Sequence, residues 1–200
     1  MSKVFGIGVN DSTHLTQKFE NIDGNRKLVW ICKYYRKWKD MLKRCYYQKD
    51  FETYRDCYVC KEWLLFSNFK AWCISFEDKY SVDIATLHLD KDLLSKGNKI
   101  YSPDKCTLLH PKVNTFILDS AKIRGELPIG VSLNKTKTKY EAYCRNPFVP
   151  KKQHYLGVYL TPEMAHLSWK NKKLGYVQDF INKGYIFCDE VKTALIERYS

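Results

Sequence analysis

The sequence has no apolar run that approaches the roughly 18 to 20 residues of a transmembrane helix. Its first residues, Met1 to Gly8, also lack the long apolar stretch of a secretion signal. Internal repeats and low-complexity segments are absent as well. These absences predict a cytoplasmic protein that does not attach to a membrane.

Acidic residues are scarce relative to basic ones. The 200 residues include 34 Lys plus Arg and 22 Asp plus Glu, which leaves a formal net charge of +12. A basic surface attracts nucleic acid, by release of counterions, or an anionic membrane. Membrane attachment commonly uses one basic amphipathic helix, whereas here the charge is spread along the chain. The composition therefore favours nucleic acid, with a merely solubilising surface as the alternative.

A second cysteine pair at metal-ligand spacing is also lacking. Of the 8 cysteines, only Cys57 and Cys60 are spaced as metal ligands, and a structural zinc ion takes four ligands, commonly from two such pairs. Without a secretion signal, disulfides are not expected either. We therefore expect reduced, buried thiols. The alternative is zinc at Cys57 and Cys60, completed by a cysteine distant in sequence: Cys45, Cys73 or Cys106.

Aromatic residues are abundant, at 15% of the chain, which supports a real core and excludes disorder as the main state. Apolar residues recur at helical spacing from Ile31 to Cys45, and the opposite face of this predicted helix is basic. The basic residues are Lys33, Arg36, Lys37, Lys39 and Lys43. We expect this face to be solvated or to lie along phosphates.

The spacing of apolar residues changes to that of strands near Leu87. It predicts a strand, a long loop, a second strand over 106–109 and a helix from Pro111. Three further strands are predicted over 129–134, 140–146 and 154–159. A helix capped by Thr161 follows and is expected to end at Gly175, before two short helices over 176–182 and 190–199.

These patterns predict an α+β fold built from successive parts. The first is an N-terminal arm with one short strand at most, and the second contains helices and a ββα finger. A linker leads to a three-stranded antiparallel sheet packed on a helix, and short helices end the chain. The expected bounds are 1–27, 28–118, 119–127, 128–175 and 176–200.

Motifs in the first half of the chain carry a family resemblance. They are Trp38-x-x-Met41-x-x-Arg44-Cys45-Tyr46, Val59-Cys60-x-Glu62-Trp63-x-x-Phe66-x-x-Phe69, Leu89-Asp90-Lys91-Asp92, Tyr101-Ser102-Pro103-Asp104-x-Cys106 and Val113-Asn114. Together they resemble bacteriophage proteins of the HNH-endonuclease-like family, which are often homing-type. The resemblance implies a protein of the phage-infected host cell.

The HNH family hydrolyses DNA with a general-base His, a divalent metal ion and an orienting Asn on a ββα finger. The resemblance implies Asp90 and Asn98 as catalytic residues and Mg²⁺ or Mn²⁺ as the cofactor. It implies that the metal ion is bound by Asp90 with His110 or Asn114. Strand geometry offers His88 as the base, because His88 shares a strand face with Asp90 and Asp92. In this chain, however, Lys91 stands where the family has its base. The alternative is therefore a solvated polar strand face on which Asp90 makes local capping or salt-bridge contacts.

A second set of motifs lies in the predicted sheet and the helix after it. The set is Ile129-Gly130-Val131, Tyr140-x-Ala142 and Tyr155-Leu156-Gly157-x-Tyr159-x-Thr161-x-Glu163-x-Ala165. It resembles the ethylene-response-factor, or APETALA, type of DNA-binding domain. In that family the sheet face opposite the helix lies in the major groove of DNA.

Strand alternation divides the predicted sheet into two faces. We expect Val131, Leu133, Ala142, Cys144, Leu156 and Val158 to point toward the helix, and Tyr155 and Tyr159 to point away from it. The resemblance implies that Arg145, and after it Asn134, contact bases. The other expected DNA-binding residues are Ser132, Lys135, Lys137, Lys139, Tyr143, Lys151, Lys152 and His154.

Three hypotheses of function follow from these observations. The chain is a metal-dependent, site-directed DNA endonuclease, or it is a DNA-binding regulator that does not cut. In the third hypothesis it binds a host protein through the aromatic residues of its N-terminal helices.

Overall fold

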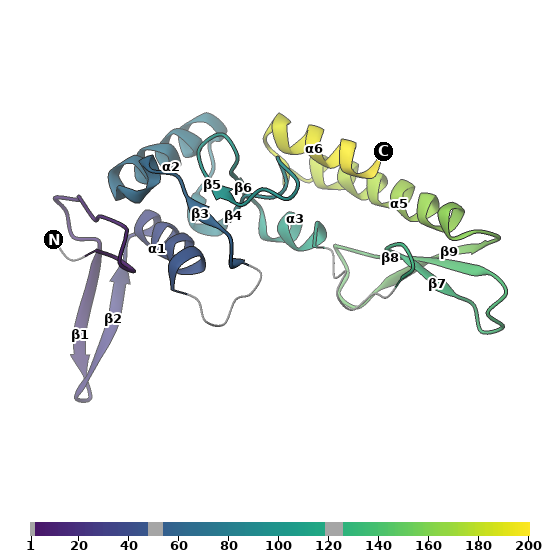
Figure 1. Ribbon diagram of the computed structural model, residues 1–200, viewed down its shortest axis with the longest axis horizontal. Helices are drawn as coiled ribbons and strands as arrows, with labels where there is room; N and C mark the ends of the chain where they lie inside the picture. The colour runs from purple at the N-terminus through teal and green to yellow at the C-terminus, as the bar shows by residue number, and fades with distance from the viewer. Residues whose placement is uncertain (1–2, 48–53, 119–125) are drawn as a thin grey trace. The chain divides into compact units, whose positions relative to one another are not determined.

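The computed structural model describes residues 3–47, 54–118 and 126–200. The chain divides into two compact units, Met1–Leu109 (unit 1) and His110–Ser200 (unit 2). Each unit contains helices and strands, so the α+β fold class is confirmed (Figure 1). Most of the linker expected at 119–127 lies outside the described ranges. Within those ranges, no helix is both long enough and apolar enough to cross a membrane.

Unit 1 begins with a two-stranded ribbon, not with the single short strand that we expected. β1 (Gln17–Ile22) pairs antiparallel with β2 (Asn25–Ile31), and Asp23 and Gly24 form the turn between them. Both turn residues have a positive φ, 52° and 76°, as in a type I′ turn, whose twist matches that of the flanking strands. The boundary expected at residue 27 therefore falls inside β2.

Two helices, α1 (Lys33–Tyr46) and α2 (Phe66–Tyr80), pack together in unit 1, and the β1–β2 ribbon extends away from them (Figure 1). The Trp38 indole donates a hydrogen bond of 2.6 Å to the carbonyl of Trp63, in the short 3₁₀ helix η2 (Glu62–Leu64). The largest side chains of this core are fully buried: Trp38, Trp63, Phe66, Phe69, Met41 and Leu42. These six side chains stabilise unit 1 and are not available to a protein partner. Binding of a host protein through these helices stays a prediction, because other aromatic residues of the two helices stay partly exposed: Tyr34, Trp72, Phe76 and Tyr80.

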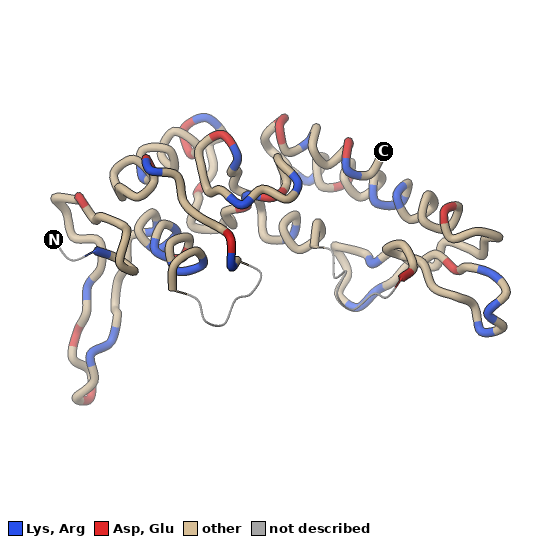
Figure 2. Tube along the Cα trace, viewed as in Figure 1, with Lys and Arg blue, Asp and Glu red and all other residues tan. Residues whose placement is uncertain are grey.

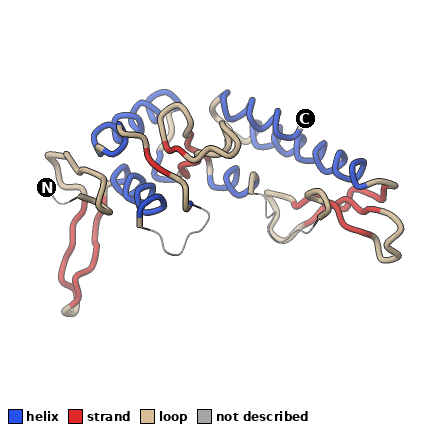
Figure 3. The backbone as a smooth tube through the Cα atoms, in the orientation of Figure 1, coloured by secondary structure: helices blue, strands red, loops and turns tan. Residues whose placement is uncertain are grey.

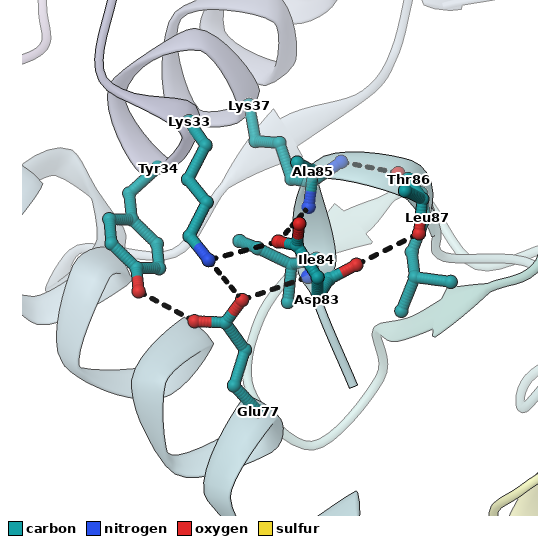
Figure 4. A network of polar contacts seen from close by, with 9 residues as sticks. All are labelled: Lys33, Tyr34, Lys37, Glu77, Asp83, Ile84, Ala85, Thr86 and Leu87. Atoms are coloured by element: carbon teal, nitrogen blue, oxygen red, sulfur yellow. Dashed lines mark hydrogen bonds and ion pairs between the residues drawn. The ribbon is translucent and has the colours of Figure 1, made fainter. Parts of the chain in front are cut away.

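Polar contacts tie α1 to α2 and to the 3₁₀ helix η3 (Ile84–Thr86) (Figure 4). Lys33 Nζ lies 2.5 Å from Glu77 Oε1 and 2.9 Å from Asp83 Oδ1. Lys37 donates a hydrogen bond to the backbone carbonyl that follows η3. Lys33 and Lys37 thus act within unit 1, and the basic helix face is smaller than we predicted.

The predicted order of strand, long loop, strand and helix is present in the finger. β4 (His88–Asp90) pairs antiparallel with β6 (Thr107–Leu109), and α3 (Pro111–Phe116) follows. The two units divide directly after β6, so α3 belongs to unit 2. The long loop contains a strand that the sequence did not reveal, β5 (Ile100–Tyr101), which pairs in parallel with β3 (Tyr58–Val59).

Unit 2 contains a three-stranded antiparallel sheet with a long helix packed on it (Figure 3). The strands β7 (Val131–Leu133), β8 (Tyr140–Arg145) and β9 (Gln153–Tyr159) lie in the order β7-β8-β9. Helix α5 (Pro162–Asn182) packs on the sheet, and α6 (Asp189–Tyr199) packs on α5. The predicted sheet-and-helix arrangement is therefore present.

The start of β7 approaches α5 closely at Gly130. Its φ is +83°, and a Cβ atom at this position would lie 2.1 Å from Cδ1 of Trp169. A side-chain nitrogen of His166 lies 2.9 Å from the carbonyl oxygen of Ile129. Glycine is thus required where the sheet meets the helix.

Helix α5 is longer than the sequence predicted. It continues through Gly175 to Asn182, because Tyr176, Val177 and Phe180 extend its buried side. The separate helix expected over 176–182 is therefore part of α5, and α6 is the only short helix after it in the described chain.

Candidate nucleic-acid interface

The sheet face that points away from α5 carries several of the predicted DNA-contacting side chains. Ala142 and Cys144 of β8 are completely buried. Because side chains alternate along a strand, Glu141, Tyr143 and Arg145 point to the opposite face. The strand register adds residues of β7 and β9 to this outward face. Its members are Ser132, Glu141, Tyr143, Arg145, Gln153, Tyr155 and Val158.

An irregularity in β9 changes which side chains reach the outward face. The pairing of β9 with β8 skips Leu156, so β9 has one extra residue at this point. An extra residue reverses the alternation of the side chains beyond it. Val158 therefore pairs with Glu141 on the outward face, and Tyr159 lies on the helix side. Our prediction for Val158 and Tyr159 was the reverse and is wrong.

Two tyrosines and a carboxylate form the centre of the outward face. The Tyr143 hydroxyl donates a hydrogen bond of 2.9 Å to Glu141 Oε2, and this bond raises the pKa of Tyr143. The ring centroids of Tyr143 and Tyr155 are 5.3 Å apart, and Tyr155 is 55% exposed. Exposed apolar surface of this kind is typical of a binding site.

The turn between β7 and β8 presents three lysines on an ordered loop. Asn134 Oδ1 accepts hydrogen bonds from the backbone N–H groups of Thr138 at 3.0 Å and Lys139 at 3.1 Å. The Asn134 side chain therefore orders the loop, which corrects our expectation that it contacts a base. Lys135, Lys137 and Lys139 are exposed on this loop.

The loop between β8 and β9, at the other end of the sheet, is also ordered by an asparagine side chain. Asn146 Oδ1 accepts hydrogen bonds from the backbone N–H groups of Phe148 at 2.8 Å and Val149 at 3.2 Å. Lys151 and Lys152 are exposed on this loop. Asparagine side chains thus order both lysine loops.

We expected His154 to join the lysines as a DNA-binding residue, but it does not. It pairs with Cys144 across the strands, which places it on the helix side of the sheet. Its ring centroid lies 6.1 Å from that of Tyr176 in α5. This placement removes His154 from the outward face.

The two lysine loops carry positive charge that is not neutralised within the described chain. None of their five lysines forms an ion pair with another described residue, and the same holds for Arg145. Figure 2 shows the basic residues of the turn between β7 and β8 as successive blue segments. β8 joins the loops and has 6 residues, so they lie about 20 Å apart at roughly 3.4 Å per residue. Positive charge therefore flanks both ends of the outward face.

In the finger, Asp90 makes local backbone contacts. Its Oδ1 accepts hydrogen bonds from the backbone N–H groups of Asp92 at 3.0 Å and Leu93 at 2.8 Å. Burial raises the pKa of Asp90. Asp90 thus caps the turn after β4, which is the alternative to metal binding that the sequence left open.

Lys91 and Asn98 hold the ends of the finger loop together. The Lys91 ammonium group lies 2.6 Å from Asp92 Oδ1 and donates to the Asn98 carbonyl at 2.9 Å. Asn98 Nδ2 returns a hydrogen bond of 2.9 Å to the Lys91 carbonyl. Burial lowers the pKa of Lys91, but the contact with Asp92 outweighs this effect and the net pKa is raised. Lys91 is therefore a structural cation, and Asn98 orders the loop instead of orienting a base.

His88, the predicted general base, is exposed and lies on the same side of β4 as Asp90. Loss of water contacts, together with the positive charges of Lys37 and Arg44 in α1, lowers the pKa of His88. The neutral imidazole that results is the form that a base needs. Its charged neighbours in α1 are nevertheless cations, which would repel a metal ion.

The other predicted metal ligands, His110 and Asn114, belong to unit 2, whereas Asp90 belongs to unit 1. His110 Nδ1 accepts a hydrogen bond of 3.2 Å from the backbone N–H of Lys112 and so caps α3. The expected metal site is therefore not assembled within either unit.

The described residues contain no group of three or more His, Cys, Asp or Glu side chains that could hold a metal ion. The Asp90 carboxylate already accepts hydrogen bonds from two backbone N–H groups, and the neighbouring Lys91 is a buried cation. The finger therefore does not fit the predicted Mg²⁺ or Mn²⁺ ion. All cysteines are free thiols, and burial raises the pKa of Cys60. Zinc at Cys57 and Cys60 stays a prediction.

Sequence reasoning missed several residues of this surface. Val158 reaches the outward face only because of the extra residue in β9, whereas Gln153 was missed because it lies just before the strand predicted over 154–159. Asn146 could have been found, because an Asn before a lysine-containing loop also occurs at Asn134. Strand alternation alone also places Glu141 on the outward face, but the sequence does not show what its charge does.

Comparison with known proteins adds no relative: no protein-family model, no curated protein and no solved structure matches the chain.

Proposed function

We propose that this chain binds double-stranded DNA through the outward face of the β7–β9 sheet and does not cut it with the finger. The observation that carries the proposal is the exposed, unneutralised charge of the two lysine loops, one at each end of the face. The major groove is about 12 Å wide. With the strands along this groove, the lysine loop at each end of a face of about 20 Å lies near the phosphates that border the groove.

The side chains between the loops fit the floor of the groove. Arg145 is exposed and presents a planar fork of donors, which suits the O6 and N7 acceptors of guanine. The lysines would bind phosphates and set the position of the sheet without reading sequence. This division of roles supports a DNA-binding regulator of the phage-infected cell, where the family resemblance implies that it acts.

The binding proposal is tested by titrating a labelled duplex with the full chain at about 0.05 to 0.3 M salt. A Lys135/Lys137/Lys139→Gln variant removes three predicted phosphate contacts. Its slope of log K against log salt should be smaller by about 2.7, at roughly 0.9 for each contact. A Lys3/Lys61/Lys192→Gln variant loses the same charge at exposed positions that do not belong to the sheet or its loops. Equal losses in both variants would contradict binding at the outward face.

The absence of cleavage is tested on supercoiled plasmid with Mg²⁺ or Mn²⁺. We expect no nicking, because Lys91 is a paired structural cation and Asp90 caps a turn. Nicking that Asp90→Asn abolishes would instead show an active nuclease. The amide oxygen of Asn retains the two backbone contacts, so a loss of activity would not reflect misfolding of the turn.

A protein partner is a second candidate, favoured by the β1–β2 ribbon. Leu28, Val29 and Trp30 of β2 are 45%, 41% and 48% exposed. Such exposure on a two-stranded ribbon is typical of an interaction site. Recovery of one host protein from a nuclease-treated lysate by the wild-type chain, but not by Trp30→Ala, would support it.

A further inference from the structure

Glu141 is an acidic residue on a face that is otherwise neutral or basic. It lies in β8 between Ser132 of β7 and Val158 of β9, and all three belong to the outward face. Its Oε2 accepts the hydrogen bond from Tyr143. Its carboxylate makes no ion pair with any described lysine or arginine, although lysines occupy the nearby turn. The position of this charge is therefore fixed, and it is not neutralised.

A fixed carboxylate that faces DNA is repelled by phosphates, so it is tolerated where a base donates a hydrogen bond to it. In the major groove, cytosine presents the N4 amino donor and no acceptor. Guanine and thymine present acceptors, and adenine places its N7 acceptor beside the N6 donor. A carboxylate therefore favours cytosine over the other three bases.

From this geometry we infer that Glu141 is a specificity-determining residue that selects cytosine, by accepting a hydrogen bond from its N4 amino group in the major groove. The inference rests on the proposed binding of duplex DNA through the outward face. Tyr143 acts as a positioning residue, since it occupies Oε2 and directs the carboxylate.

Arg145 lies on the same strand and the same face, four residues from Glu141. Four residues of a strand span about 13 Å, which is the length of about four stacked base pairs at roughly 3.4 Å each. For a strand that runs along the groove, the preferred site then contains a cytosine and a guanine about four positions apart.

The experiment is a selection of bound sequences from a randomised duplex library with the full chain, wild type and Glu141→Gln. Glutamine donates and accepts together and matches the N6 and N7 atoms of adenine. We expect Glu141→Gln to change the preference at one position from cytosine to adenine, by about 5- to 100-fold. Glu163→Gln makes the same charge change in the first turn of α5, away from the outward face, and should leave the preferred site unchanged.

The outcomes separate the inference from the proposed function. Binding with the same preferred site in wild type and Glu141→Gln, or wild-type binding with no sequence preference, would overturn the role of Glu141 and leave DNA binding intact. No measurable binding of any duplex by the wild type would overturn the proposed function, and the role of Glu141 with it.

Discussion

The finger of unit 1 and the sheet of unit 2 both contain asparagine-ordered loops with lysines, but they use the lysines in opposite ways. In the finger, Lys91 is only 6% exposed and is paired with Asp92. On the sheet, five loop lysines are exposed and form no ion pair with a described residue. A paired, buried cation stabilises its own fold, whereas an exposed, unneutralised one is available to a polyanion. The difference supports the proposal that the sheet binds DNA, and it gives the finger lysine a structural role.

The largest expected effect comes from two glycines, one in each unit. A Cβ atom at Gly130 would lie 2.1 Å from Trp169 Cδ1, and one at Gly8 would lie 2.3 Å from Leu42 Cδ1. Overpacking destabilises by about 1–3 kcal/mol, and the positive φ of Gly130 adds about 1 kcal/mol. We therefore expect Gly130→Ala to destabilise unit 2 by about 3 kcal/mol and Gly8→Ala to destabilise unit 1 by about 2 kcal/mol.

Hydrogen exchange read by mass spectrometry reports the two units separately, and duplex affinity is measured on the same samples. Gly130→Ala should weaken DNA binding, and Gly8→Ala should not at temperatures where unit 2 stays folded. Equal loss of affinity in both variants would mean that the binding surface also depends on unit 1.

A smaller effect is expected when the finger cation is removed. Lys91→Gln breaks the contact with Asp92 and leaves the Asn98 carbonyl without its donor. An unsatisfied buried group costs about 1–3 kcal/mol, so we expect unit 1 to lose about 2 kcal/mol in denaturant unfolding. Lys96→Gln, at an exposed position of the same loop, is the matched control with little expected change. A large loss of duplex affinity in Lys91→Gln would contradict a purely structural role.

The response to pH also separates the two units. Lys173 of α5 is buried and donates a hydrogen bond of 2.7 Å to the Phe116 carbonyl, and burial lowers the pKa of Lys173 to about 8. Above pH 8 the unfolded chain therefore binds more protons at this group, so the free energy of unfolding rises with pH. From about pH 8 to 9 the gain is about 1 kcal/mol.

Lys91 in unit 1 has a raised pKa. Its contribution to the free energy of unfolding is therefore fully present between pH 8 and 9 and does not change over this range. Unfolding of the wild type and Lys173→Met at several pH values checks the difference, which the Met variant should lack. Ionisation of cysteines in the unfolded chain opposes the gain from Lys173 as the pH approaches 9, because burial raises the pKa of Cys144 in the folded chain. A difference in stability between the wild type and Lys173→Met that does not change between pH 8 and 9 would contradict the role of Lys173.

The sequence alone predicted the elements of unit 2 better than the roles of individual side chains. Alternation and turn residues located all three strands, and Thr161 marked the start of α5. The extra residue at Leu156 could not be predicted, because apolar alternation continues through it while the pairing does not. Asn134 and Asp90 were interpreted as contact residues because sequence shows which groups are polar, not which backbone N–H groups lie beside them.

The end of α5 could not be predicted from the sequence either. Substitutions at Gly175 and Gly184, which have the smallest expected effect, test where the helix ends. The sequence pattern predicted that a helix ends at Gly175, yet α5 continues to Asn182 and the residue that follows with positive φ is Gly184, at +71°. An added Cβ at Gly175 meets nothing within 4 Å, so Gly175→Ala should stabilise unit 2 by about 0.5–1 kcal/mol. Gly184→Ala should destabilise it by a similar amount, because alanine is strained at that φ. Thermal unfolding of both variants decides the matter, since a loss of stability in Gly175→Ala would place the end of the helix where the sequence pattern put it.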